Sequence, residues 1–279
     1  MVHELVNQYI GALIAIFLVT AMFSLGLDLT LRQIVGSLRD RRLVAVSLLA
    51  NLAVVPLLAL IITSLIPMDE GLRVGIVIYA FAAGTEGGPK FVQLIKGNTA
   101  FAFGLLVLLL IYTVTIVPLI LPLVIDGAQI DTGAILIKLL LVVALPIGLG
   151  LLLNARYQRL ANRLNPIVHG LAMFLLYFLV ALLVYVNFQQ LVSMQAGALL
   201  AGVLFFVLAF ATGYLAGGPD ARNRRALGIM TFGRNGSISM MIATEVFTDD
   251  PTVLVMATMM TATAVVVGVL IVNGMRRFT

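Results

Sequence analysis

Long apolar runs constrain the fold of this chain more than any other feature of its sequence. A membrane-spanning helix needs about 20 mostly apolar residues. About nine segments meet this requirement and use nearly the whole chain: 9–26, 43–65, 72–96, 99–124, 132–154, 168–188, 195–217, 226–247 and 251–275. Since lipid offers no hydrogen bonds to the backbone, such runs form helices. The sequence therefore predicts an all-α polytopic membrane protein with about nine transmembrane helices.

The low content of charged residues supports this class. Of 279 residues, 62% are hydrophobic and 10% are charged, whereas about a quarter of the residues in a soluble domain are charged. The net charge of +5 does not indicate a nucleic-acid partner, because the basic residues lie in short loops between apolar runs. The expected partners are the lipid bilayer and a small organic anion. The sequence leaves the oligomeric state open.

The distribution of charge between the runs predicts an orientation, because cytoplasmic loops collect Lys and Arg. Every second loop is basic, with Arg32, Arg39, Arg41, Arg42, Lys96, Arg156, Arg159, Arg163, Arg222, Arg224, Arg225, Arg276 and Arg277. The segments between them contain one basic residue, Arg73, and most of the acidic residues. The first residues also lack the pattern of a cleaved signal peptide. We therefore expect an inner or plasma membrane of prokaryotic type, with the N-terminus outside and the C-terminus in the cytoplasm.

Two of the apolar runs begin alike, which indicates an internal repeat. LRVGIVIYAFAAGTEGGPK (72–90) and RALGIMTFGRNGSISMM (225–241) both pass from an apolar stretch into a Gly-rich polar break. The two runs are five spans apart, and an odd offset places the copies in opposite orientations. Inverted repeats of this kind are typical of secondary transporters. The sequence predicts that the first four spans correspond to the last four.

The two breaks predict interrupted helices in the middle of the membrane. They comprise residues 84–89 and 233–237. Gly weakens a helix, and Pro removes a hydrogen-bond donor. Unwound backbone at this depth is tolerated only where protein or a water-filled cavity surrounds it. Each break also begins a half-helix, whose N-terminus favours an anion. We expect the two broken helices to cross.

Three charged residues lie at or beside the breaks, namely Glu86, Lys90 and Arg234. An ionisable group at the centre of a bilayer costs about 2.5–3.5 kcal/mol, so their presence favours a functional role. Glu86 is four residues from Lys90 and would face Arg234 across the crossing, so pairing is expected. The residual positive charge favours a substrate with a carboxylate. The alternative is a salt bridge that only fixes two helices together.

The predicted substrate-binding residues are mostly polar or glycine residues at the two breaks. They are Glu86, Gly87, Gly88, Lys90, Arg234, Asn235, Gly236, Ser237, Asn51 and Asn187. Ser24, Asp28 and Gln190 are further candidates, although Asp28 is more simply interpreted as a solvated loop residue. Lys138 is expected to extend along its span towards the aqueous boundary.

An intramembrane enzyme is disfavoured. It needs a nucleophile with a base, or a metal cluster, but the chain has no cysteine and only two histidines. One of them, His169, is expected near the end of its span and far from both breaks. No catalytic residue and no metal ligand is predicted. A membrane sensor is disfavoured because no appended output domain is recognised.

Several local motifs occur in a familiar order. They are MFSLGLDLT (22–30), Asn51 five residues before Pro56, KGN (96–98) and GRNGS (233–237). Together with the paired breaks, they resemble the bile acid:sodium symporter family over nearly the whole chain. The resemblance implies a core domain of crossing helices (43–124 and 195–275) and a panel domain (9–26 and 132–188). It also implies that substrate binds between these domains and crosses by alternating access.

The chain departs from this family where sodium-using members hold their ligands. The resemblance places Gly88-Pro89 where those members have Ser-Asn, and Ala102 and Leu106 where they have hydroxyls. Thr231 and Asn235 stand where they have Glu and Gln. Hard cations require several oxygen ligands, and most are absent here. No cofactor is therefore expected.

The basic residues at the breaks suggest a substitute for sodium. We expect the charge of Lys90 or Arg234 to stabilise the crossing in place of a bound cation. Transport would then be sodium-independent, either as uniport or coupled to protonation of Glu86. The alternatives are a sodium-coupled symporter of organic anions and a channel or efflux carrier on the same scaffold.

Overall fold

The computed structural model describes residues 2–30, 36, 40–125 and 131–276. Within these residues, helices account for nearly all of the regular structure. The α-helices are α1 (Val2–Asp28), α3 (Arg41–Leu49), α4 (Val55–Leu65), α5 (Glu70–Phe81), α6 (Gly88–Leu94), α7 (Thr99–Thr115), α8 (Val117–Val124), α9 (Thr132–Leu139), α10 (Leu145–Arg156), α11 (Gln158–Val186), α12 (Phe188–Val192), α13 (Ala196–Ala216), α14 (Ala221–Phe232), α15 (Gly236–Val246) and α16 (Pro251–Arg276). Two π-helical turns, η1 (Ala50–Val54) and η2 (Leu140–Ala144), join α3 to α4 and α9 to α10.

Six of the described helical stretches are long and apolar enough to cross a membrane. They are Tyr9–Asp28, Arg41–Leu65, Thr132–Arg156, Gln158–Val186, Ala196–Ala216 and Pro251–Arg276. Helices α7 and α8 together make a seventh stretch, bent by 55°. The predicted all-α membrane class is thus confirmed. The pairs α5/α6 and α14/α15 occupy the two remaining predicted spans, so the total of nine remains a prediction.

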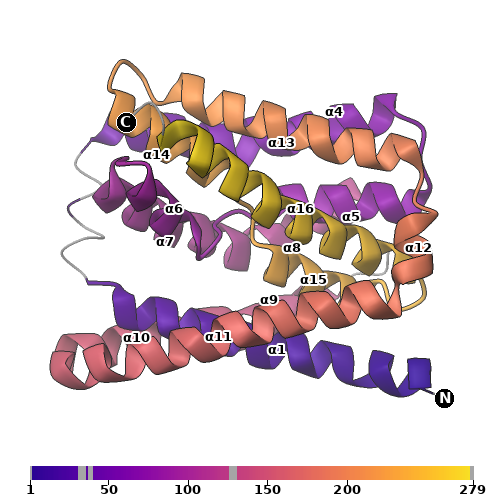
Figure 1. Cartoon of the computed structure of the whole chain (residues 1–279), viewed down its shortest axis with the longest axis horizontal. Coiled ribbons are helices and arrows are strands. Elements are labelled where there is room, and N and C mark those ends of the chain that lie inside the picture. The colour runs from indigo at the N-terminus through magenta and orange to yellow at the C-terminus, as the bar shows by residue number, and fades with distance from the viewer. Residues whose placement is uncertain (1, 31–35, 37–39, 126–130, 277–279) are drawn as a thin grey trace.

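The helices form two groups (Figure 1). Helices α1, α10 and α11 pack against one another along one side, here called the side layer. Most of the remaining helices, α4–α7 and α13–α16, form the second group, here called the main bundle. Within the side layer, α1 and α10 approach closely at Gly26 and Gly150, where a Cβ atom on Gly26 would lie 2.4 Å from the Ile147 carbonyl oxygen. Small residues permit such contact between helix backbones in membranes.

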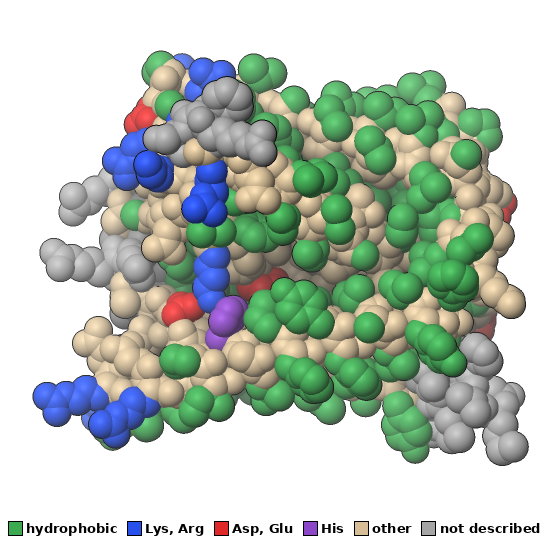
Figure 2. Space-filling model, viewed as in Figure 1, with side chains coloured by type: hydrophobic (Ala, Val, Ile, Leu, Met, Phe, Trp, Pro, Cys, Tyr) green, Lys and Arg blue, Asp and Glu red, His purple; other side chains and the backbone are tan. Residues whose placement is uncertain are grey.

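The surface is apolar along its length and basic at one end. Figure 2 shows hydrophobic side chains over most of one face, with Lys and Arg gathered at the end where α6, α10 and α14 lie in Figure 1. Large side chains such as Leu65, Phe174 and Leu123 are well exposed. Soluble monomers rarely expose contiguous apolar patches of more than a few hundred Å². This surface suits a lipid environment.

Each π-helical turn precedes a proline. In η1, the Val55 N–H bonds to the Ala50 carbonyl, five residues back. The next residue, Pro56, has no N–H. With the same five-residue spacing, a residue with an N–H at position 56 would bond to the Asn51 carbonyl. Pro56 cannot supply that bond. Pro146 follows η2 in the same way. Buried carbonyls are almost always bonded, so the Asn51 carbonyl needs another donor.

Two boundaries differ from the prediction. Helix α11 begins at Gln158, ten residues before the expected start at 168, because Gln, Arg, Leu and Ala in this segment favour a helix. The run 99–124 is bent at Ile116 rather than straight, and Pro118 lies in the first turn of α8, which begins at Val117. The basic residues Arg32, Arg39 and Arg277 of the predicted orientation lie outside the described residues.

Candidate functional site

The structure brings the two breaks together. Ala83 and Arg234 pair as an isolated antiparallel bridge, and the Asn235 N–H donates to the Ala82 carbonyl at 2.7 Å. The Asn235 side chain donates to the Gly84 carbonyl at 2.9 Å. These bonds satisfy backbone groups that the interrupted helices leave free. The segments after α5 and α14 therefore support each other inside the protein.

Helix α7 braces the first break. Gly84 has a φ of 90°, in a region that glycine enters without the steric penalty of a side chain. A Cβ atom there would also lie 3.1 Å from the Cβ atom of Leu109. The Thr113 hydroxyl donates to the Ala83 carbonyl at 2.8 Å. The turn at Gly84 is thus fixed by its own conformation and by contacts from α7.

The second half-helix, α15, begins with an Asn cap. The Asn235 side-chain oxygen accepts from the Ile238 N–H at 3.0 Å and from the Ser237 hydroxyl at 2.8 Å. Asn is among the preferred N-cap residues because it satisfies an N–H that the first turn leaves free. Asn235 therefore does two tasks, since it caps α15 and also bonds the first break.

Glu86 bonds to the second break through neutral groups. Its carboxylate accepts from the Asn235 amide at 3.3 Å and from the Ser237 hydroxyl at 3.4 Å. The expected pairing with Lys90 or Arg234 is wrong, because neither cation lies within 4.0 Å of this carboxylate. Glu86 precedes the first residue of α6, so four-residue spacing along a helix does not apply to it.

Arg234 bonds to the main bundle and not to Glu86, although both residues line one cavity. Its side chain is 2% exposed, and Nη1 donates to the Asn51 carbonyl at 3.3 Å. This is the carbonyl that Pro56 does not bond. The Asn51 amide in turn donates to the Ser47 carbonyl at 2.9 Å and to the Thr231 hydroxyl at 3.1 Å. Asn51 and Arg234 thus form part of the packed interior behind the crossing.

A small cavity lies at the crossing, where the main bundle meets the side layer, and Arg234 is one of its lining residues. Its volume is about 80 Å³, and its walls include Glu86 and Ser237 from the breaks and Phe17 and Leu176 from α1 and α11. Gly88 and Gly236 also line it, whereas Gly87 does not. One liquid water occupies about 30 Å³. A cavity of this size accepts a group as large as a carboxylate but not a whole drug-sized ligand.

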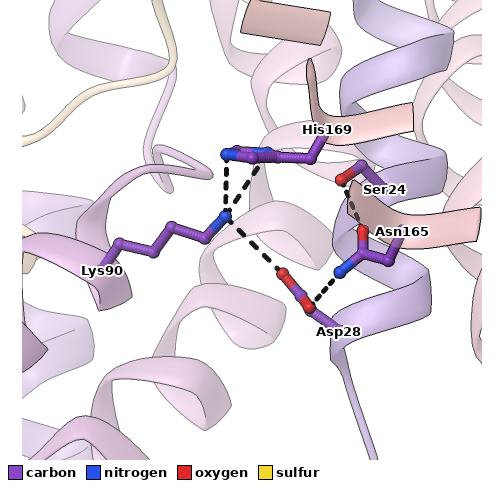
Figure 3. A network of polar contacts seen from close by, with 5 residues as sticks. All are labelled: Ser24, Asp28, Lys90, Asn165 and His169. Carbon is purple, nitrogen blue, oxygen red and sulfur yellow. Dashed lines mark hydrogen bonds and ion pairs between the residues drawn. The ribbon is translucent and has the colours of Figure 1, made fainter. Parts of the chain in front are cut away.

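Lys90 connects the main bundle to the side layer (Figure 3). Its Nζ lies 3.8 Å from the Asp28 carboxylate and 3.0 Å from Nε2 of His169. Asn165 donates to Asp28 and accepts from the Ser24 hydroxyl. These five residues, here called the Lys90 network, come from α1, α6 and α11. Lys90 thus contacts Asp28 and His169 of the side layer, and Asn165 in turn bonds to Asp28 and Ser24.

The Lys90 network corrects two expectations. Asp28 was expected in a solvated loop, but it is the last residue of α1 and pairs with Lys90. His169 was expected far from both breaks, but its ring contacts the half-helix that follows the first break. Because α11 starts early, at Gln158, His169 lies about three turns into the helix rather than at its end. Both contacts join segments that are distant in sequence.

A larger cleft opens where α12 lies. Its volume is about 1070 Å³, and it is lined by the ends of α1, α11 and α15, by α12 and by the start of α16. Asn187 and Gln190 line this cleft, so the structure does not bring them to the crossing. The Asn187 amide donates to the Leu183 carbonyl at 2.9 Å. Lys138, expected to extend towards the aqueous boundary, pairs with Glu245, and both side chains are partly exposed.

These features define a polytopic, all-helical membrane protein whose two interrupted helices meet beside a cavity between helix groups. The model of the Sodium Bile acid symporter family matches residues 15–194, which is more than half of the chain. The chain therefore belongs to the sodium bile acid symporter family. The family and the apolar helices together identify an integral membrane protein.

Curated relatives agree with this assignment. "Probable sodium/metabolite cotransporter BASS1, chloroplastic" of Arabidopsis thaliana is 23% identical over 82% of this chain and 58% of the relative. "Probable sodium/metabolite cotransporter BASS3, chloroplastic" of the same plant is 26% identical over 69% of this chain and 45% of the relative. The BASS3 protein of Oryza sativa subsp. japonica is 23% identical over 80% and 55%. The chain thus spans about half the length of these relatives.

Proposed function

We propose that this transporter moves a small carboxylate-bearing anion by alternating access, without sodium. The main bundle corresponds to the core domain (43–124 and 195–275). The side layer, together with α9 and η2, corresponds to the panel domain (9–26 and 132–188). In this proposal, the first four spans repeat as the last four in inverted orientation. The cavity between Glu86 and the side layer supports this division, because it lies where the two domains would move apart.

One observation carries the proposal that sodium is not needed. A buried guanidinium, that of Arg234, lies behind the crossing and bonds to a carbonyl of the main bundle. A permanent charge at this position stabilises the surrounding carbonyl dipoles as a bound cation would. The positions that hold sodium ligands in the family resemblance carry Gly88, Pro89 and apolar residues instead. The buried charge of Arg234 and the absence of sodium ligands both favour sodium-independent transport.

The polar groups at the domain interface favour a carboxylate substrate. Lys90 presents a half-exposed ammonium between the main bundle and the side layer. The Ser237 hydroxyl and the N-terminus of α15 face the cavity at the crossing, and helix N-termini favour anions. Glu86 adds a possible proton site, because a protonated carboxyl group donates a bond that the carboxylate form only accepts.

The orientation follows from the basic end, which we place in the cytoplasm of a prokaryotic-type membrane. The cleft at α12 then opens to the outside, and the Lys90 network closes the domain interface on the cytoplasmic side. This arrangement corresponds to an outward-facing state. The substrate enters through the cleft, whose lining includes Asn187 and Gln190. Release to the cytoplasm requires separation of Lys90 from Asp28.

Uptake into proteoliposomes tests the proposal. Radiolabelled short carboxylates such as pyruvate, succinate and acetate are supplied in sodium buffer or in potassium buffer. We expect saturable uptake of at least one carboxylate at equal rates in both buffers. The printed names of the relatives favour the second candidate, a sodium-coupled symporter. A tenfold or greater acceleration by sodium would establish that candidate, and non-saturable flux would indicate a channel.

A further inference from the structure

The Lys90 network contains a histidine whose contact with Lys90 requires an uncharged ring. The Lys90 ammonium lies 3.0 Å from Nε2 and 3.3 Å from Nδ1 of His169. An ammonium has three hydrogens to donate and no lone pair to accept, so a ring nitrogen must be the acceptor. Only a neutral imidazole has a nitrogen without a proton. The geometry therefore corresponds to the network with His169 in its neutral form.

Protonation of His169 would remove this contact. Both ring nitrogens would then be donors, and two positive charges would lie at hydrogen-bonding distance, where they repel each other. Asp28 carries one negative charge and lies 3.8 Å from Lys90 Nζ, on a different side of the ammonium from the ring (Figure 3). Its carboxylate also accepts a bond from Asn165. A single carboxylate does not neutralise two cations, so protonation weakens the hold of the side layer on Lys90.

Lys90 from α6 and Asp28 from α1 are the charged groups that face the His169 ring. The other charged or histidine residues of α11, and of the described helices packed against it, lie within two turns of a helix end. They are His3, Glu4, Arg156, Arg159, Arg163 and Arg276. Glu4 is at the opposite end of α1 from Asp28, about 36 Å along the helix. The Glu86 carboxylate, four residues before Lys90, bonds to the second break instead.

The elements that carry Lys90 and His169 also line the cavity at the crossing. Phe91, the residue after Lys90, and Leu176, seven residues after His169, are both among its lining residues. Lys90 is on the half-helix α6, whereas His169 is on α11 of the side layer. The side chains of Lys90, Asp28 and His169 are partly exposed near the end of α1, so protons have access to the ring. A change of charge at His169 therefore acts on the contact between the two helix groups, beside the cavity.

We propose that His169 is a proton-binding site that controls the attachment of α6 to the side layer. The neutral ring holds Lys90. A proton on the accepting nitrogen replaces that hydrogen bond by repulsion, and the ammonium leaves with all three of its hydrogens. The consequence for transport rests on the proposed function, in which release to the cytoplasm requires separation of Lys90 from Asp28. The proton-dependent contact itself does not depend on any substrate.

Nuclear magnetic resonance of the ring nitrogens tests the proton site directly. The chain has two histidines, His3 and His169, so His3→Gln leaves a single labelled ring when histidine carries nitrogen-15. The full chain in lipid nanodiscs is titrated from about pH 9 to about pH 4 without substrate, which covers the range where histidine ordinarily changes charge. We expect the His169 signals to pass from the neutral to the protonated form. A ring that keeps one charge state throughout would overturn the proposal.

Lys90→Met shows whether the proton and the lysine oppose each other. Coupling between two binding events is reciprocal, so removal of the ammonium should make His169 bind its proton at least about tenfold more tightly. The midpoint of the titration then moves up by about one pH unit or more. The matched control is Lys138→Met, which removes a lysine from a different ion pair and should leave the midpoint unchanged. An unchanged midpoint in Lys90→Met would contradict the proposal.

Distances between spin labels test the release of α6. The sequence has no cysteine, so Gln93→Cys on α6 and Ile167→Cys on α11 provide two exposed labelling sites. Pulsed electron paramagnetic resonance then measures the distance between the two helix groups as the pH falls. We expect the ratio of a longer to a shorter distance to rise about tenfold, in line with the coupling that Lys90→Met reveals. Equal distances at high and low pH would overturn the control of attachment.

His169→Gln separates the proton site from its structural role. Glutamine retains an oxygen that accepts from Lys90 but does not bind a proton in this range, so the labels should keep the shorter distance at every pH. His3→Gln should respond to pH as the wild type does. A pH response that persists in His169→Gln would assign the effect to another group. Failure of the carboxylate proposal would appear in the uptake assay alone, because these measurements contain no substrate.

Discussion

The two breaks have similar sequences, but their charged residues have different bonding partners. At the first break, Glu86 faces the cavity between the main bundle and the side layer. At the second break, Arg234 turns into the main bundle and bonds to the Asn51 carbonyl. Glu86 therefore bonds to residues of the second break, whereas Arg234 bonds to the π-helical turn η1. A sequence repeat does not imply that its charged residues share one role.

The half-helices that follow the two breaks also have different bonding partners. Helix α6 has seven residues and carries Lys90, which reaches the side layer. Helix α15 has eleven residues, and its capping residue Asn235 bonds back to the first break. The half-helix after the first break therefore contacts the side layer. Asn235 of the second break instead joins the two breaks to each other. The family match ends at residue 194 and includes only the first break.

The strongest test of this contrast removes the buried cation. Arg234→Gln should reduce carboxylate uptake on the order of a hundredfold, since a charge at this depth is worth about 2.5–3.5 kcal/mol. Initial uptake rates into proteoliposomes measure the effect. Arg156→Gln, at the exposed end of α10, is the matched control and should transport normally. Uptake within threefold of wild type by Arg234→Gln would refute the role of this charge.

A smaller effect is expected at the first break. Glu86→Gln keeps the shape but weakens the bonds from Asn235 and Ser237, so uptake should fall about tenfold. If Glu86 carries a coupling proton, the variant should also lose the dependence of uptake on external pH. Because Glu86 and Arg234 do not pair, the double variant with Arg234→Gln should be no better than Arg234→Gln alone. Recovered transport in the double variant would instead support a simple salt bridge.

Backbone strain at the first break is tested by comparing substitutions at Gly84 and Gly87. Gly84→Ala places a side chain at a φ of 90°, which should lower the free energy of unfolding by about 1–2 kcal/mol. Gly87→Ala is the control, because a Cβ atom there has open space around it and φ is negative. Thermal unfolding followed by circular dichroism compares the two proteins. Equal midpoints would mean that the turn at Gly84 does not require glycine.

The smallest effect is expected in the Lys90 network. Asp28→Asn removes the ion pair with Lys90. Because the side chains of Asp28 and Lys90 are both partly exposed, the loss of stability should stay below about 1 kcal/mol. The same change should favour opening at the basic end of the protein. Proteolysis or labelling from that side measures the opening. Asp249→Asn, in the exposed loop before α16, serves as the control. Unchanged accessibility in Asp28→Asn would show that the network does not restrain opening.

The sequence predicts the helices well because membrane-spanning length and apolarity are local properties. Gly and Pro likewise mark both breaks, since their effect on a helix is local. The partners of the charged residues are not predicted, because side-chain direction at an unwound segment does not follow the helical period. Glu86 was assigned to Lys90 by helical spacing, although α6 begins only after Glu86. His169 was placed too far away because ten residues of α11 were expected to be a loop.

The proline after η1 has a consequence for the order in which this interior could evolve. Pro56 leaves the Asn51 carbonyl without its backbone donor, and Arg234 supplies one from the other half of the chain. A residue with an N–H at position 56 would compete for that carbonyl and leave the guanidinium with fewer partners. The two positions are therefore expected to show epistasis: arginine at 234 is tolerated best after proline is present at 56. Reconstructed intermediates that carry each residue alone would reveal this historical constraint.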